Sequence, residues 1–454
     1  MSAFVGSSYA MRNRSGAKQR AVNLIPVPVE GAGEPVSKSF KDWPGLVEFA
    51  DLGAQIRGAI NSNGRRLVVS GSSLVDLASD GTTTSRGSLG SSTGLVDFAA
   101  NASQICVTDG ASLYVLNRTT NVLTTAAGYG GGSRIDVLNE FLFFVDAGTG
   151  RVGWTNVGDA ATIDALDYAT AEESPDNLIC PIVSGGELLL IGKSSIGVWR
   201  LIGGDEVVVP SGRSIEVGCD SPMTPRRLDN TVFFVGTDEE RGQRGVFKIA
   251  GSVHQRISTR WVEELISGLD LTEADGTAVY FAGHAFYALN VNGLETPLVF
   301  DVMSGLWFEA GEWVNGAWQQ VRWNAHLSAF NKTLLGGADG KLYELDATAS
   351  SNDGDVLRRV RVMPEIRRAD GKRIRFPELR VICDTGAGGN LMVRWSDDSG
   401  NSWGDWEYIS LGDIGNFDHW VSLHAMGSAD RRTYELVVTD DVPWNPSDVI
   451  IRTV

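Results

Sequence analysis

The chain has 454 residues, of which 54 are glycine and 14 are proline, and charged residues make up 21% of it. This composition is typical of a folded, turn-rich protein and excludes intrinsic disorder and a collagen-like repeat. The formal net charge of −17 argues against general binding to duplex DNA, because Lys and Arg supply most of the affinity for the phosphate backbone. No run of about 18 apolar residues and no apolar signal segment occurs, so we expect neither export nor a membrane span.

The first expected element is extended, at residues 22–29. Pro26 and Pro28 stand one residue apart, and proline excludes a helix because it lacks the backbone N–H and clashes with the preceding turn. The same prolines remove donors from a β-ladder. We therefore interpret residues 1–45 as an extended N-terminal arm that lies along another surface.

Short apolar runs then recur at a spacing of roughly 37 to 55 residues, near the period of propeller blades. The seven runs begin at Leu67, Ile105, Phe141, Leu188, Val232, Val279 and Leu334. A turn and a second alternating run follow each one, which predicts one β-hairpin per unit. Asp109-Gly110 and Asp339-Gly340 supply the positive φ of tight turns. Because a four-stranded blade buries both faces only against neighbouring blades, we predict an all-β fold with a six- or seven-bladed β-propeller over residues 46–347.

One helix is expected, at residues 258–266, where a hydroxyl N-cap and an acidic pair precede Gly268 as the stop signal. Residues 347–355 form a small, polar linker. Strand-like alternation returns beyond it, for example at residues 434–438. We therefore predict that residues 348–454 form a C-terminal β-sandwich-like domain.

The C-terminal region contains the pattern S-x-D-x-G-x-S-W, the Asp box of sialidase propellers. Ser396, Asp398, Gly400 and Trp403 occupy its defining positions. In such a turn the carboxylate accepts backbone N–H bonds, the glycine adopts a conformation that a Cβ would hinder, and the tryptophan packs beneath the loop. A sialidase needs several copies, an arginine cluster and a tyrosine nucleophile on the propeller. A single copy beyond the repeats predicts a structural hairpin turn instead.

No motif predicts a catalytic, cofactor or metal site. Residues 148–153 match G-x-G-x-x-G, but dinucleotide binding needs a following helix, and strand and turn residues follow here, so the glycines are assigned to a blade hairpin. The histidines are scattered, and Cys106, Cys180, Cys219 and Cys383 form no C-x-x-C pair. We expect buried free thiols, no cofactor, no metal and no enzymatic activity.

One segment of this acidic chain is strongly basic. Strand alternation puts Arg359 and Arg361 on one face of a first strand and Arg373 and Arg375 on one face of a second, and a turn at Asp370-Gly371 could pair the two strands. Three interpretations stay open: a solvated edge, docking against an acidic neighbour, and a contact with DNA. We treat the four arginines as candidate partner or subunit contacts.

Several phrases occur in an order that is familiar. They are the arm at residues 22–29 with Trp43-Pro44-Gly45-Leu46, residues 168–176 before the strand 188–192 and the turn Ser194-Ser195-Ile196, Gly218-Cys219-Asp220-Ser221-Pro222, Arg256-Ile257-Ser258-Thr259, and residues 284–289. Their order resembles the tail nozzle proteins of short-tailed bacteriophages, also called packaged-DNA stabilisation proteins or tail accessory factors. The resemblance covers residues 21–346.

The resemblance implies a virion structural protein, assembled in the host cytoplasm as a homohexameric ring at the distal end of the tail. Such a nozzle extends the channel of the portal and adaptor, holds a needle or plug, helps retain packaged DNA and conducts it at ejection without binding it specifically. Tailspikes or fibres are further partners that it allows. No family phrase can be placed in the first twenty residues or after Gly354, and the family has no catalytic residues to carry over.

Two alternatives stay open. The Asp box and the thirteen tryptophans are compatible with a carbohydrate-binding or glycoside-hydrolysing β-propeller. A generic propeller scaffold for protein partners is the other alternative. The charge favours the conduit, because six copies of a chain of −17 would make an electronegative duct along which DNA slides rather than binds.

Overall fold

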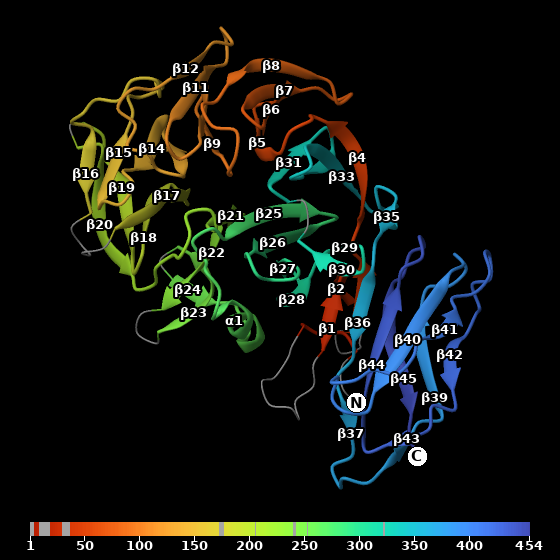
Figure 1. Ribbon diagram of the computed structural model, residues 1–454. Helices are drawn as coiled ribbons and strands as arrows, with labels where there is room; N and C mark the ends of the chain where they lie inside the picture. The colour runs from red at the N-terminus through yellow and green to blue at the C-terminus, as the bar shows by residue number, and fades with distance from the viewer. Residues whose placement is uncertain are drawn as a thin grey trace.

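The computed structural model describes residues 4–8, 19–29, 37–171, 177–204, 206–238, 242–251, 253–320 and 323–454. These residues form short β-strands joined by turns, together with the helix α1 (Arg260–Ile266) (Figure 1). Among the described residues, no helix has the length and apolarity that crossing a membrane requires. The all-β prediction is confirmed.

Within the described residues, seven four-stranded antiparallel sheets form the blades of a β-propeller (Figure 1). Five of them are separate sheets, and two are parts of larger ones. The first four blades are β5 (Ile56–Ser62), β6 (Arg65–Ser70), β7 (Ser73–Leu77) and β8 (Thr83–Ser88); β9 (Asp97–Ala100), β10 (Gln104–Thr108), β11 (Leu113–Asn117) and β12 (Leu123–Thr125); β13 (Ile135–Leu138), β14 (Phe141–Val145), β15 (Arg151–Trp154) and β16 (Tyr168–Thr170); and β17 (Leu178–Ser184), β18 (Glu187–Gly192), β19 (Ile196–Leu201) and β20 (Val208–Ile215).

The remaining blades are β21 (Arg226–Leu228), β22 (Thr231–Asp238), β23 (Gln243–Ala250) and β24 (Val253–Arg256); β25 (Asp275–Phe281), β26 (His284–Asn290), β27 (Leu298–Asp301) and β28 (Leu306–Glu309); and β31 (Ala325–Ala329), β32 (Lys332–Gly336), β33 (Lys341–Asp346) and β4 (Gly45–Asp51). The predicted turns lie between strands of these blades. Gly110 and Gly340 have φ of 88° and 91°, and Gly148 of the G-x-G-x-x-G stretch, with φ of 73°, lies in the turn between β14 and β15. Such positive φ values favour glycine, because a Cβ would be strained there.

The seventh blade combines the two ends of the propeller. Its outer strand β4 precedes the first blade in the sequence and pairs antiparallel with β33, with Leu46 opposite Leu345. A buried apolar cluster that includes Ile56 and Val68 of blade one and Leu334 of blade seven fills the adjoining interface. Similar clusters lie between the other neighbouring blades, so apolar burial closes the ring on every side.

Charged side chains occupy the axis of the propeller. Arg134, at the start of blade three, is buried and lies 3.1 Å from Asp97 of blade two through Nε and Oδ2. It also donates a hydrogen bond of 2.6 Å from Nη1 to the carbonyl oxygen of Pro225, at the start of blade five. Blades three and five are not neighbours, so this bond reaches past blade four. Burial, with the charge of Arg134 acting in the same direction, lowers the pKa of the nearby Arg226 to about 10.

The N-terminal arm lies between the propeller and the C-terminal region. Strand β1 (Arg20–Val22) runs parallel to β28 of blade six, with Val22 beside Glu309, and antiparallel to β36 (Arg359–Val362), with Val22 opposite Val360. The blade and the C-terminal sheet therefore form one continuous sheet through β1 (Figure 1). The following strands β2 (Leu24–Val29) and β3 (Ser37–Asp42) form a hairpin.

The C-terminal residues form two packed β-layers. One contains β36, β44 (Arg431–Val438), β40 (Asn390–Ser396) and β41 (Glu407–Ser410), and the other contains β42 (Val421–His424), β39 (Glu378–Cys383) and β45 (Pro446–Arg452). Leu379, Leu391 and Leu436 are buried between them. The short strands outside these layers and the main blades are β29 (Glu312–Val314), β30 (Ala317–Gln319), β34 (Ser351–Asn352), β35 (Asp355–Val356), β37 (Ile366–Arg367), β38 (Ile374–Arg375) and β43 (Ser428–Ala429).

Two local predictions have clear outcomes. Helix α1 begins two residues later than the predicted range, with Thr259 as its N-cap, and the side chain of Thr259 accepts a hydrogen bond from the Val262 amide. All four cysteines are free, and three of them are buried, as predicted.

Candidate functional site

The first two candidate arginines are buried inside this chain. Arg359 is fully buried, and its Nη1 donates a hydrogen bond of 2.9 Å to Oδ2 of Asp42, in the arm. Its guanidinium also donates to the carbonyl oxygens of Asp440 and Val442. Burial raises the pKa of Asp42 to about 6, although Arg359 lowers it in opposition. Arg359 thus holds the arm hairpin to the C-terminal domain.

Arg361, two residues further along β36, is also fully buried. It donates to Oε1 of Gln19 at 3.1 Å, and its guanidinium lies over the rings of Phe40 and Phe4 at 5.1 and 5.8 Å. Within the described part of the chain, no carboxylate lies within ion-pair distance of it. Burial accordingly lowers the pKa of Arg361 to about 9. This side chain contacts the arm of its own subunit.

The other two candidates lie elsewhere, and the predicted hairpin is wrong. Strand β36 pairs with β1 and β44, whereas β38 pairs with β43, so a turn at Asp370-Gly371 does not bring the two basic strands together. Arg373 and Arg375 are exposed, and Arg373 donates to the carbonyl oxygen of Ser428 at 2.9 Å. The four arginines therefore form no common surface. A subunit contact stays a prediction for the exposed pair.

A basic cleft of about 750 Å³ lies at the same end of the C-terminal domain as Arg373. Its walls include Arg367 of β37 and Arg431 of β44, which stand directly opposite each other in the antiparallel register. Both side chains are exposed. Figure 1 shows β37 and β43 together at this end of the domain. We use the term basic cleft for Arg367, Arg368, Arg373 and Arg431.

The Asp box forms a compact turn after β40. Oδ1 of Asp398 accepts hydrogen bonds from the amides of Asn401 and Ser402 at 3.0 and 2.9 Å, and the Ser396 hydroxyl donates to the same oxygen. These bonds, with one from the Ser402 hydroxyl, hold the pKa of the carboxyl well below its usual range. Gly400 has φ of 81°. Because the carboxylate is engaged by its own turn, it acts here as a structural group.

The half-buried Trp403 completes this turn. Its ring packs against an apolar cluster that contains Val22 of the arm and Val360 of β36. The Arg394 guanidinium lies 5.0 Å from the ring centroid, at cation–π distance. The Asp-box turn is thus packed against the junction between the arm and the C-terminal sheet.

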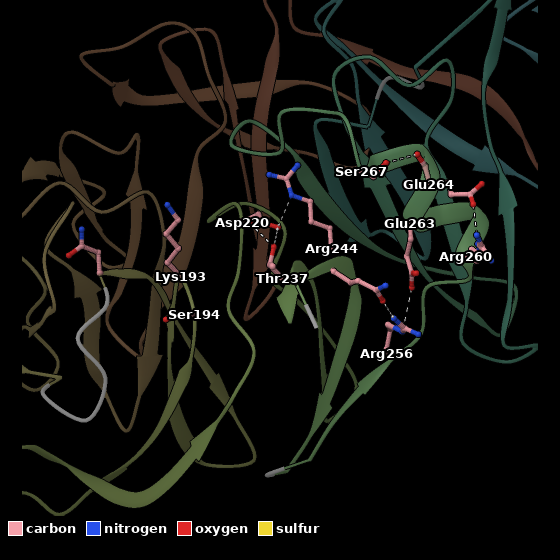
Figure 2. Close-up of a pocket in the computed structure, with 13 residues that line it drawn as sticks. Lys193, Ser194, Asp220, Thr237, Arg244, Arg256, Arg260, Glu263, Glu264 and Ser267 are labelled. Atoms are coloured by element: carbon pink, nitrogen blue, oxygen red, sulfur yellow. Dashed lines mark hydrogen bonds and ion pairs between the residues drawn. The ribbon is translucent and has the colours of Figure 1, made fainter. Parts of the chain in front are cut away.

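A second, larger cavity of about 1300 Å³ lies between blades four and five and helix α1 (Figure 2). Three ion pairs line it: Arg244 with Asp220 at 4.0 Å, Arg256 with Glu263 at 3.4 Å and Arg260 with Glu264, both on α1, at 3.1 Å. Lys193 at its edge forms no ion pair with a described residue. Burial raises the pKa of Asp220, although the charge of Arg244 opposes this. The charges are largely neutralised in pairs, which fits a structural cleft between blades.

The cavity in Figure 2 brings together three of the phrases that carry the family resemblance. Ser194, Asp220 and Arg256 come from the turn after β18, the segment before β21 and the end of β24, respectively. The sequence did not predict that these phrases meet. All three segments lie between neighbouring blades.

Several important residues were missed by sequence reasoning. Asp42 lies in the arm and its partner Arg359 lies 317 residues further along the chain, so no local pattern identifies the pair. Arg134 follows a glycine-rich loop and carries no motif. Arg431 is part of the basic cleft because it lies opposite Arg367, and this register depends on the tertiary pairing of β37 and β44.

Comparisons with known proteins give a family. A family model described as "Bacteriophage P22 Gp10, beta-propeller" matches residues 6–350, which is more than half of the chain. No curated protein matches the chain.

Among the described residues, no group of three or more His, Cys, Asp or Glu side chains is arranged to hold a metal ion.

Solved structures are similar to this chain at the level of the fold only. The computationally designed protein Ika8 is 15% identical over 66% of this chain and 99% of its own, with a TM-score of 0.38. The extracellular domain of BT4673 from B. thetaiotaomicron is 9% identical over 83% of this chain and 49% of its own, with a TM-score of 0.44. An exo-beta-1,3-galactanase from Phanerochaete chrysosporium is 8% identical over 79% and 95%, with a TM-score of 0.30. Such scores carry no argument about function.

The match over residues 6–350 shows that the chain belongs to the bacteriophage P22 Gp10 β-propeller family of phage structural proteins that stabilise packaged DNA.

Proposed function

We propose that the chain is a subunit of a homohexameric tail nozzle, which extends the channel of the portal and adaptor and helps retain packaged DNA. The observation that carries this proposal is the family match over residues 6–350. The proposed partners are the tail adaptor, a needle or plug and, on the outside, tailspikes or fibres. Assembly would occur in the host cytoplasm, and the final location would be the virion tail.

The structure of the axis supports a conduit between subunits. Arg134 reaches from blade three to the carbonyl oxygen of Pro225 in blade five, with Asp97 beside it. Arg134 thus links blades that are not neighbours, beside the first strands of blades three and five, which leaves less room there for a duplex. We therefore place the path of DNA in a lumen that several subunits enclose, as in a ring.

The charge of the chain supports passage without retention. Each subunit has a formal net charge of −17, and six copies around a lumen would repel phosphates on average. Tight phosphate contacts would instead make release depend strongly on salt. We therefore assign the retention of DNA to the plug and to mechanical closure. At ejection, we expect DNA to slide along a repulsive wall.

The decisive experiment is imaging of the parent particle, with the mass of the purified chain as a second measurement. We expect tomography to place six propellers below the portal, in a ring with one shared lumen. A particle in which the chain forms no ring around the tail axis would overturn the proposal.

We further propose that the chain is not an enzyme. The Asp398 carboxylate, which motivated the carbohydrate alternative, accepts hydrogen bonds within its own turn. A fluorogenic sialoside assay and a glycan array test this, with a true sialidase as the positive control. We expect no turnover and no glycan bound above background. Hydrolysis of a glycoside would favour the carbohydrate-active alternative.

A further inference from the structure

Two like charges face each other in the basic cleft. Arg367 and Arg431 are directly opposite in an antiparallel pair, so their side chains project from the same face. Both are exposed, and neither guanidinium forms a hydrogen bond, ion pair or ring contact with a described residue. Like charges in this position destabilise a sheet, and neither guanidinium has an ion-pair partner among the described residues. An external anion between the two guanidinium groups would offset this repulsion.

The carboxylates around the cleft offset only part of its positive charge. Asp397 forms a bidentate pair with Arg432, with N–O distances of 2.6 and 2.8 Å. Asp370 forms a similar pair with Arg368, and Glu365 accepts from the Ser399 hydroxyl. Asp430 is the remaining carboxylate in the wall. Arg367, Arg373 and Arg431 thus exceed the available negative charge, so the cleft is suited to an acidic segment.

A complementary feature lies at the opposite end of the same domain. Residues 413–418, which we call the apical loop, have the sequence Asp-Ile-Gly-Asn-Phe-Asp, and all six are exposed. Ile414 is 87% exposed and Phe417 is 80% exposed, which is unusual for side chains of this size. Acidic residues flank both of them. Strand β39 runs from the cleft end of the domain to the loop end, so the two features lie at opposite ends (Figure 1).

The apical loop is held in place rather than free. The Gly415 amide donates to the carbonyl oxygen of Gly386 at 2.9 Å, and the Asn416 amide donates to that of Asp413 at 2.9 Å. Phe417 lies over Gly386, where an added Cβ would come within 2.7 Å of its ring. A preformed loop loses little conformational entropy when it binds, which favours association.

We propose that the apical loop of one copy of this chain docks in the basic cleft of a second copy. Asp413 and Asp418 would pair with Arg367 and Arg431, and the Phe417 ring would pack against arginine side chains. The domain itself shows such packing, since Arg380 lies 3.5 Å from the ring centroid of Trp420. The contact joins unlike surfaces, and a heterologous contact of this kind closes into a ring when its rotation permits.

This inference rests on the ring of the proposed function and names one contact within it. A second copy is favoured over DNA because one contact provides both the anion that the cleft lacks and a cover for Ile414 and Phe417. A phosphate backbone would leave these apolar side chains exposed. The chain's charge of −17 also opposes the approach of DNA.

The test is a charge-reversal exchange, read by sedimentation of the full chain at the highest soluble concentration. We expect Arg367→Glu with Arg431→Glu to raise the dissociation constant about a hundredfold, and Asp413→Lys with Asp418→Lys to do the same. Mixing the two variants should restore assembly in alternating order, because the native loop of one variant fits the native cleft of the other and the two reversed surfaces fit each other. The fourfold variant should also assemble again. Arg200→Glu and Glu273→Lys are matched controls, because both side chains are exposed on the propeller, and they should leave assembly unchanged.

Three results would overturn the inference. They are a wild-type chain that stays monomeric, charge-reversed variants that assemble as the wild type does, and cleft variants that lose only binding to a duplex DNA probe. None of these decides the proposed function, because particle imaging can still find the ring with a different contact. Conversely, self-association through this contact in a particle without a tail ring would contradict the proposed nozzle function and still support the contact.

Discussion

Arg359 and Asp42 form a buried ion pair that joins two parts of the chain 317 residues apart, with 2.9 Å between Nη1 and Oδ2. The amide of the buried Trp444 donates to the same carboxylate oxygen at 2.6 Å. The pair thus links the arm, strand β36 and the segment before β45.

We expect Arg359→Met to lower the free energy of unfolding of the C-terminal domain by about 3–5 kcal/mol, because it leaves the Asp42 charge buried without its partner. Intrinsic tryptophan fluorescence during denaturant unfolding gives the measurement. The double variant Arg359→Met with Asp42→Leu should recover at least half of the loss, since an apolar pair removes the unpaired charge. Equal losses in the single and double variants would contradict this role of the pair.

Arg361→Met should behave differently, although it lies only two residues away. Arg361 is buried without an ion-pair partner among the described residues, and its folded pKa of about 9 is below the ordinary 12.5. The charged form is therefore disfavoured by folding at neutral pH, and removing it relieves desolvation. We expect a free energy of unfolding within about 1 kcal/mol of wild type, or higher. A loss as large as that of Arg359→Met would show that the contacts with Gln19 and Phe40 outweigh desolvation.

The pH dependence of stability should contain a component from Asp42. Its folded pKa of about 6 lies above the ordinary 3.8, so its contribution is fully present below pH 4 and is lost as the pH rises through 6. The size is on the order of 2–3 kcal/mol. Asp42→Asn keeps a similar shape and removes this titration. The difference between the two unfolding curves, measured from pH 4 to 8, should therefore change by that amount, and a flat difference would refute the assignment.

Closure of the propeller can be tested with a disulfide. Val47 of β4 lies opposite Glu344 of β33, so Val47→Cys with Glu344→Cys would close a loop of nearly the whole propeller. Lys248→Cys with Gln255→Cys is the local control, because these residues lie opposite each other in the β23–β24 hairpin. Chain entropy predicts that the long loop stabilises by about 3 kcal/mol more than the short one. The shift in midpoint on adding a reductant measures each value; similar shifts would show that β4 does not close the ring.

The sequence predicted those features of the fold that depend on neighbours along the chain. The apolar runs at Leu67 and Ile105 became β6 and β10, and the glycine of Asp109-Gly110 took the positive φ that its turn requires. Local patterns carry this information because a hairpin pairs residues that are close in the sequence. The helix after Thr259 followed from its capping residues in the same way.

The features that the sequence did not predict depend on distant pairing. Both faces of β36 are buried, because arm residues cover Arg359 and Arg361 and a cluster that includes Trp403 covers the valine face. Alternation along the strand does not reveal this burial. The count of seven blades required the pairing of β4 with β33, nearly 300 residues later. The opposition of Arg367 and Arg431 likewise follows from the register between β37 and β44.

The position of β4 has a consequence for synthesis of the protein. The first strand of the seventh blade leaves the ribosome before any strand of the other six, and it waits until residues 341–346 have been translated before it can pair. The arm strand β1 waits longer, for β36. Chains that end before these residues therefore keep an open last blade and an unpaired leading segment.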